Sequence, residues 1–99
     1  MSEYEPKQED GDAVVDLPKI NKADAEWRLI RAELFRAIER RPAFHSAHEG
    51  YGAILDELAK LWDEMCKQYD TQGRRAAIRK EATQVAAMTI RFLIDVCDD

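Results

Sequence analysis

Two acidic side chains, Glu57 and Glu81, lie at the border of or inside the apolar stripes of predicted helices. Glu57 lies on the border of the apolar stripe of a helix predicted over 47–69, and Glu64 lies further along the same border. Glu81 lies inside the apolar stripe of a helix predicted over 74–96. Because an unpaired carboxylate is costly to desolvate, we expect Glu81 to meet a cation or to be hydrogen-bonded as a neutral acid.

The cation that meets Glu81 has two possible sources. Carboxylates on facing helices of a bundle can hold a divalent metal such as Mg²⁺, which prefers oxygen ligands. An ordinary salt bridge would instead pair Glu81 with a basic side chain, and the candidates are Arg28, Lys60 and Arg91. The residues alone leave both possibilities open.

A basic cluster opens the helix predicted over 74–96. Its members are Arg74, Arg75, Arg79 and Lys80. Cations gain nothing from the positive end of a helix dipole, but free backbone amides and arginines at such an end can receive a phosphate group. The cluster therefore indicates either a phosphate site or a solvated basic face.

Helical periodicity from residue 21 onward supplies the elements that carry these groups. The first helix is predicted over 22–40, with Asn21 as its N-cap and Pro42 beyond its end. Its apolar residues recur at steps of three and four, at Trp27, Ile30, Leu34 and Ile38.

The helix predicted over 47–69 begins at a capping box, Ser46 with Glu49. The C-terminal half of the helix predicted over 74–96 is apolar nearly all round, so it needs cover on more than one side. Since three helices of this size cannot enclose it, we expect an all-α, three-helix unit that forms a helical bundle by dimerisation.

Length and charge indicate one domain with an acidic arm. The chain has 99 residues, 4 Gly and 3 Pro, which disfavours an all-β fold. Residues 1–18 hold six acids and one base, a balance of −5, whereas 19–99 hold 14 of each, a balance of zero. We expect 1–20 to be a disordered acidic arm and 21–99 to be the all-α domain. An acidic arm on a neutral body does not suit general nucleic-acid binding.

The cellular setting follows from what the sequence lacks. No apolar run is long enough to span a membrane, and the N-terminus has no secretory signal pattern. The 2 cysteines are too few for a disulfide framework. These features predict a cytoplasmic protein with no membrane partner.

The stretch 48–92, about half the chain, resembles the MazG-like branch of the all-α nucleoside triphosphate pyrophosphohydrolases. The segments that carry the resemblance read Ile54-Leu-Asp-Glu-Leu-Ala-Lys-Leu-Trp-Asp-Glu-Met65 and Arg79-Lys-Glu-Ala-Thr-Gln-Val-Ala-Ala-Met88. In that family one helix carries E-E-x-x-E and a later helix carries E-x-x-D. The resemblance implies Mg²⁺ binding by these helices, cleavage of a nucleoside triphosphate to monophosphate and pyrophosphate, and a homodimer or tetramer.

Position by position, the first motif falls on Asp56, Glu57 and Lys60, and the second on Glu81 and Gln84. Glu57 and Glu81 match the family, and Asp56 is a similar replacement. Lys60 and Gln84 depart from it, because the family has metal-binding carboxylates at both positions. Glu64 could partly compensate for the lost charge.

The leading hypothesis is a Mg²⁺-dependent, MazG-like nucleotide pyrophosphohydrolase. Glu57 and Glu81 would be its catalytic residues, and together with Glu64 its metal ligands. The residues predicted to bind the triphosphate are Lys60, Arg74, Arg75 and Arg79. The alternative is a helical dimer that has lost catalysis and serves as a binding or scaffolding module, since Lys60 could neutralise a carboxylate without any metal.

Overall fold

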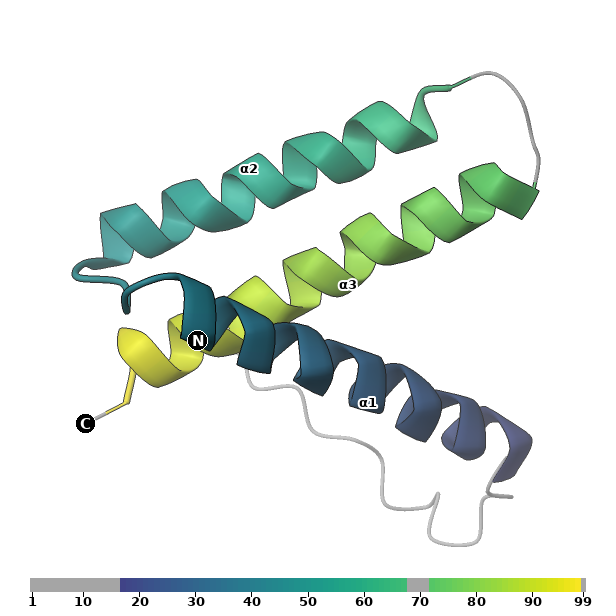
Figure 1. Ribbon diagram of the computed structural model, residues 1–99, viewed down its shortest axis with the longest axis horizontal. Helices are drawn as coiled ribbons and strands as arrows, with labels where there is room; N and C mark the ends of the chain where they lie inside the picture. Colours follow the sequence, from purple (N-terminus) through teal and green to yellow (C-terminus); the bar gives the residue numbers. More distant parts are fainter. Residues whose placement is uncertain (1–16, 68–71, 99) are drawn as a thin grey trace, which may run out of the picture.

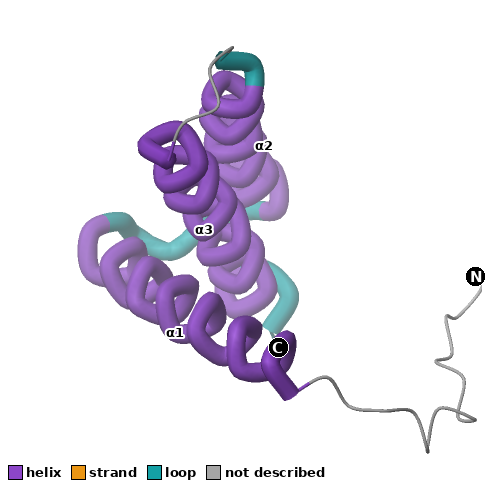
Figure 2. Tube along the Cα trace, turned by 90° about the vertical axis from the view of Figure 1, so that its right-hand side faces the viewer, coloured by secondary structure: helices purple, strands orange, loops and turns teal. Residues whose placement is uncertain are grey.

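Three helices make up the part of the chain that the computed structural model describes, residues 17–67 and 72–98. They are α1 (Leu17–Arg40), α2 (Ala47–Met65) and α3 (Gln72–Asp95). α2 and α3 lie side by side and antiparallel, whereas α1 converges with α3 at their C-terminal ends and diverges from it toward their N-terminal ends (Figures 1 and 2). The predicted all-α class is confirmed, since the described residues form no strand.

The start of α1 differs from the prediction. The helix begins at Leu17, so Asn21 lies inside it and is not its N-cap. The physical reason is Pro18 in the first turn, where its fixed φ suits a helix and its missing N–H costs no intrahelical bond. The last residues of the predicted arm are therefore helical, and 1–16 lie outside the described residues.

The predicted start of α2 is confirmed. Ser46 is the N-cap, and its Oγ accepts a hydrogen bond of 3.1 Å from the backbone N–H of Glu49. The Glu49 carboxylate in turn accepts a hydrogen bond from the backbone N–H of His45, one residue earlier than the usual capping box. α2 ends at Met65, short of the predicted residue 69, and 68–71 lie outside the described residues.

The core is small for the length of the chain. Its buried hydrophobic residues are Leu34, Ala87 and Met88. The radius of gyration is 16.6 Å, compared with about 13 Å for a compact domain of about 100 residues. Many large apolar side chains consequently stay on the surface of all three helices. None of the described helices is both long and apolar enough to cross a membrane.

A buried arginine fastens the end of α1 to α3. Arg91 is only 3% exposed, and its guanidinium donates to the carbonyl oxygens of Ala37, at 2.7 Å, and Arg41, at 2.6 Å. Its Nε donates to Oδ2 of Asp95 at 3.0 Å, and the same oxygen accepts the backbone N–H of Phe44 at 3.0 Å. The Arg41 carbonyl is one that the end of a helix leaves without an intrahelical donor, whereas the Ala37 carbonyl also accepts the backbone N–H of Arg41 at 3.0 Å. The junction fixes where α1 meets α3.

Gly50 allows α2 to approach this junction closely. A Cβ added at Gly50 would lie 2.5 Å from Cδ2 of Phe92 and 3.0 Å from Cδ2 of Phe44. Gly50→Ala is therefore expected to lower the free energy of unfolding by about 1 kcal/mol, because overpacking outweighs the gain in helix propensity. Urea denaturation measures the change. A more stable variant would contradict this close packing.

Candidate functional site

A cavity of about 260 Å³ lies where all three helices come together, and each helix contributes one carboxylate to its wall. These carboxylates are Glu33 from α1, Glu57 from α2 and Glu81 from α3. The remaining lining residues are Arg36, Ala37, Arg40, Arg41, Lys60, Lys80, Gln84 and Met88. The two acids that match the family motifs thus line the same cavity.

The more deeply buried of these two acids is Glu57, contrary to the expectation that Glu81 is the buried one. Glu57 is 5% exposed, and its Oε2 lies 3.4 Å from Nζ of Lys60. Glu81 is half-buried, and within the described part of the chain its carboxylate makes no hydrogen bond or ion pair. The reason is the divergence of α1 from α3, which leaves the N-terminal half of α3 partly open on that side.

Glu33 is a site residue that the sequence reasoning missed. Its carboxylate accepts a hydrogen bond of 3.1 Å from Nε of Arg36. This bond is the main reason why the pKa of Glu33 is lowered, and a hydrogen bond from Gln84 adds to it, whereas burial opposes it. The spacing of Glu33, Ala37 and Arg40 could have indicated that these residues share one face of α1, since steps of four and three place residues on one side of a helix.

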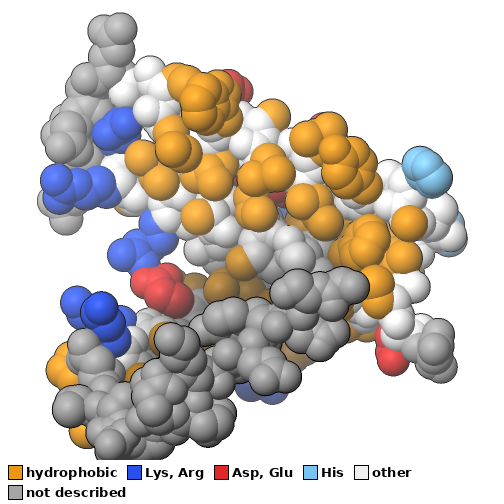
Figure 3. Space-filling model, turned by 180° about the vertical axis from the view of Figure 1, so that it is seen from behind, with side chains coloured by type: hydrophobic (Ala, Val, Ile, Leu, Met, Phe, Trp, Pro, Cys, Tyr) orange, Lys and Arg blue, Asp and Glu red, His pale blue; other side chains and the backbone are white. Residues whose placement is uncertain are grey.

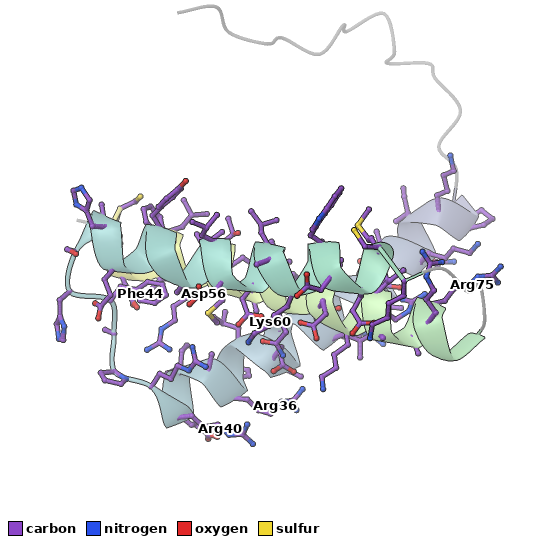
Figure 4. The ribbon with its side chains drawn as sticks, turned by 90° about the horizontal axis from the view of Figure 1, so that it is seen from above. Arg36, Arg40, Phe44, Asp56, Lys60 and Arg75 are labelled. Carbon is purple, nitrogen blue, oxygen red and sulfur yellow. The ribbon has the colours of Figure 1, made fainter. Side chains whose placement is uncertain are left out.

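Cationic groups outnumber the carboxylates around the cavity. Five of the lining residues are lysines or arginines and three are glutamates, a formal balance of +2. Figure 4 shows Lys60 on the side of α2 that faces α1, with Arg36 and Arg40 across from it. In the described part of the chain, Arg40 and Lys80 form no hydrogen bond or ion pair through their side chains. Such groups suit the oxygen atoms of a phosphate.

Two predicted site residues lie away from the cavity. Glu64 pairs instead with Lys67, at 3.0 Å between Oε2 and Nζ. Arg74 donates through Nη2 to the carbonyl oxygen of Met65, at 2.9 Å, and so caps the end of α2. Neither residue lines the central cavity.

The other two predicted phosphate ligands, Arg75 and Arg79, line a separate cleft between the diverging halves of α1 and α3. This cleft has a volume of about 760 Å³ and includes apolar side chains such as Ile30 and Ile78. Arg79 forms an ion pair with Glu26 across it. The basic cluster at the start of α3 is thus divided, with Lys80 alone lining the central cavity.

The carboxylates of the cavity are too few to hold Mg²⁺ without further ligands. Among the described residues, no three Asp, Glu, His or Cys side chains are grouped so as to hold a metal ion by themselves. Mg²⁺ in nucleotide sites is usually held by one or two carboxylates together with substrate phosphates and water. Glu57 from α2 and Glu81 from α3 line the cavity, and they are the two carboxylates that would meet this smaller demand together with substrate phosphates and water.

The lowered pKa of Glu33 predicts a pH dependence of stability. A carboxyl group whose pKa is lower in the folded state stabilises the fold above its unfolded pKa, and this stabilisation is lost as pH falls through the folded value. Glu33→Gln is therefore expected to lose less stability than the wild type as pH falls below about 4.5. Urea midpoints at several pH values measure this. An equal acid response in Glu33→Gln and the wild type would contradict it, with Glu39→Gln on the exposed side of α1 as the control.

Comparison of the chain with protein-family models, with curated proteins and with solved structures finds no match.

Proposed function

We propose that the chain is a MazG-like nucleoside triphosphate pyrophosphohydrolase, which cleaves the bond between the α and β phosphates to give a monophosphate and pyrophosphate. The observation that carries this proposal is the shared cavity of Glu57 and Glu81. These positions match the family motifs, lie on different helices and face one site together with cationic side chains. The homodimer or tetramer implied by the resemblance belongs to the same proposal.

The cavity residues divide into two roles under this proposal. Arg36, Arg40 and Lys80 bind the phosphate oxygens, because their charges favour an anion and because Arg40 and Lys80 form no side-chain hydrogen bond or ion pair among the described residues. Glu57 and Glu81 hold Mg²⁺ together with the triphosphate. When bound, Mg²⁺ neutralises phosphate charge and polarises the phosphoryl group. Glu81 also accepts a hydrogen bond from the attacking water, since its carboxylate has no other partner in the described residues.

A second candidate is a phosphate-binding module without catalysis. The observation that favours it is the contact between Lys60 and Glu57, with 3.4 Å between Nζ and Oε2. Lys60 supplies the positive charge that Mg²⁺ would otherwise provide, and the cavity is already cationic in formal balance. Such a site would bind a phosphate-bearing ligand and leave it intact.

Pyrophosphate release from a panel of nucleoside triphosphates, with and without Mg²⁺, tests the first proposal. The hydrolase proposal predicts Mg²⁺-dependent release from at least one nucleotide. Nucleotide binding without release in either condition would contradict it and support the binding module. Absence of both binding and release would contradict both candidates.

The double variant Lys60→Glu with Gln84→Asp separates the two candidates further, because it restores acids at both departures from the family motifs. Calorimetry measures Mg²⁺ binding by both proteins. Binding by the variant and not by the wild type would show that the wild-type site has lost the ability to bind Mg²⁺. Mg²⁺ binding by both proteins in the presence of nucleotide supports the hydrolase.

A further inference from the structure

A second, smaller pocket lies beside the central cavity, between α1 and α3 and nearer to their N-terminal ends. We call it the side pocket, and its volume is about 180 Å³. It shares Glu33, Arg36 and Lys80 with the central cavity, so the two hollows adjoin each other. The other residues that line the side pocket are Leu29, Ala76, Arg79 and Thr83. Figure 3 shows from behind how the molecule is hollowed where the N-terminal halves of α1 and α3 lie apart.

The central cavity is too small for a whole nucleoside triphosphate. Its volume is about 260 Å³, whereas a pocket that encloses a drug-sized ligand has roughly 300 to 1,000 Å³. A ligand whose phosphates fill the central cavity must therefore place its base and sugar outside it. The side pocket adjoins the cavity, and the two volumes together fall within that range.

The side pocket differs from the central cavity in charge. The lining of the central cavity has a formal balance of +2. Among the described residues that line the side pocket and not the central cavity, Arg79 is the one that carries a charge, and its ion pair with Glu26 offsets that charge. Phosphates are therefore attracted to the central cavity, and an uncharged group is suited to the side pocket.

The side chains of the side pocket can contact a base and a sugar. Leu29 from α1 and Ala76 from α3 offer apolar surface. The planar guanidinium of Arg79 can stack on the face of a base. The Thr83 hydroxyl donates to the carbonyl oxygen of Arg79 at 2.8 Å, so its oxygen can still accept a hydrogen bond from a hydroxyl or amino group. These contacts suit an uncharged aromatic group with hydrogen-bond donors.

We infer that the side pocket is the nucleoside subsite of the chain. The base and sugar lie between Leu29 of α1 and Arg79 of α3, and the α phosphate lies at the boundary with the central cavity, beside Arg36 and Lys80. Arg79, which the sequence predicted as a phosphate ligand, contacts the nucleoside in this arrangement. The inference rests on the proposed binding of a triphosphate in the central cavity but not on its hydrolysis.

Two kinds of probe with the same triphosphate chain test the subsite: the α,β-methylene analogues of ATP, GTP, CTP and UTP, and inorganic tripolyphosphate. Calorimetric titration of the full chain in the presence of Mg²⁺ measures their affinities. The wild type is expected to bind at least one analogue about 10-fold more tightly than tripolyphosphate, because the nucleoside buries apolar surface in the side pocket. Equal affinities would overturn the inference and leave the proposed function intact. Binding of neither kind of probe would overturn both.

Leu29→Ala tests where the nucleoside lies. Leu29 is 49% exposed and lines the side pocket but not the central cavity, so its truncation should leave the fold intact. The variant is expected to bind the preferred analogue about fivefold more weakly and tripolyphosphate with unchanged affinity. Leu55→Ala is the matched control, because Leu55 is also 49% exposed but lies on α2 and lines neither hollow. Unchanged binding of the analogue by Leu29→Ala, equal weakening of both probes, or the same loss in Leu55→Ala would overturn the inference.

Discussion

Glu57→Gln is expected to lower the kcat/KM for Mg²⁺-dependent pyrophosphate release by at least about 100-fold. Loss of a residue that only supports a metal ligand already costs up to about 100-fold, and under the proposal Glu57 is itself a ligand. The amide has nearly the shape of the carboxylate, so the 5% exposed side chain keeps its packing while the charge is lost. Steady-state kinetics at saturating Mg²⁺ measure the effect. Asp63→Asn, on the exposed side of the same helix, is the matched control and should retain activity.

If the chain is a phosphate-binding module without catalysis, Glu57→Gln is expected to strengthen its function and not to impair it. Without a metal, Glu57 is a negative charge in the wall of a phosphate site, so its removal should tighten nucleotide binding. Calorimetric titration without Mg²⁺ measures that affinity. Unchanged turnover in Glu57→Gln would contradict the role of this carboxylate in catalysis.

Arg91→Met is expected to lower the free energy of unfolding by about 3 kcal/mol. Methionine fills much of the buried volume but donates no hydrogen bond to the carbonyl groups of Ala37 and Arg41. It also leaves Asp95 without its ion pair, although the backbone N–H of Phe44 still reaches that carboxylate. Urea denaturation, compared with the wild type at equal protein concentration, measures the loss.

The matched control for Arg91→Met is Arg28→Met on the exposed surface of α1. Its effect should stay within about 0.5 kcal/mol, as is usual for surface substitutions. An equally small effect for Arg91→Met would show that the hydrogen bonds at this junction contribute little to holding α1 against α3.

The sequence predicted the start of a helix correctly where the residues that cap it lie close together in the chain. The Ser46 and Glu49 cap starts α2 as expected, because hydrogen bonds within a few residues decide it. Asn21 was wrong as the start of α1, since Pro18 already supports a helical first turn. A cap residue marks a start only where no earlier residue favours the helix.

The site was harder to predict because it depends on how the helices cross. Periodicity identified Glu57 and Glu81 as candidate site residues but wrongly predicted that Glu81 is the more buried of the two. The divergence of α1 from α3 decides which side chain is more exposed. Sequence patterns did not single out Glu33 or Arg36, which form an ion pair on α1. Only the place where α1 meets α3 brings them to the same cavity as the motif residues.

A crystal structure of the chain with Mg²⁺ and a non-hydrolysable nucleoside triphosphate tests the central claim most directly. The hydrolase proposal predicts phosphates between the three helices, in contact with Arg36 or Lys80, and a metal ion on Glu57 and Glu81. Lys60 would then have moved away from Glu57. Nucleotide bound elsewhere, or a cavity without phosphate in which Lys60 still contacts Glu57, would contradict the proposal.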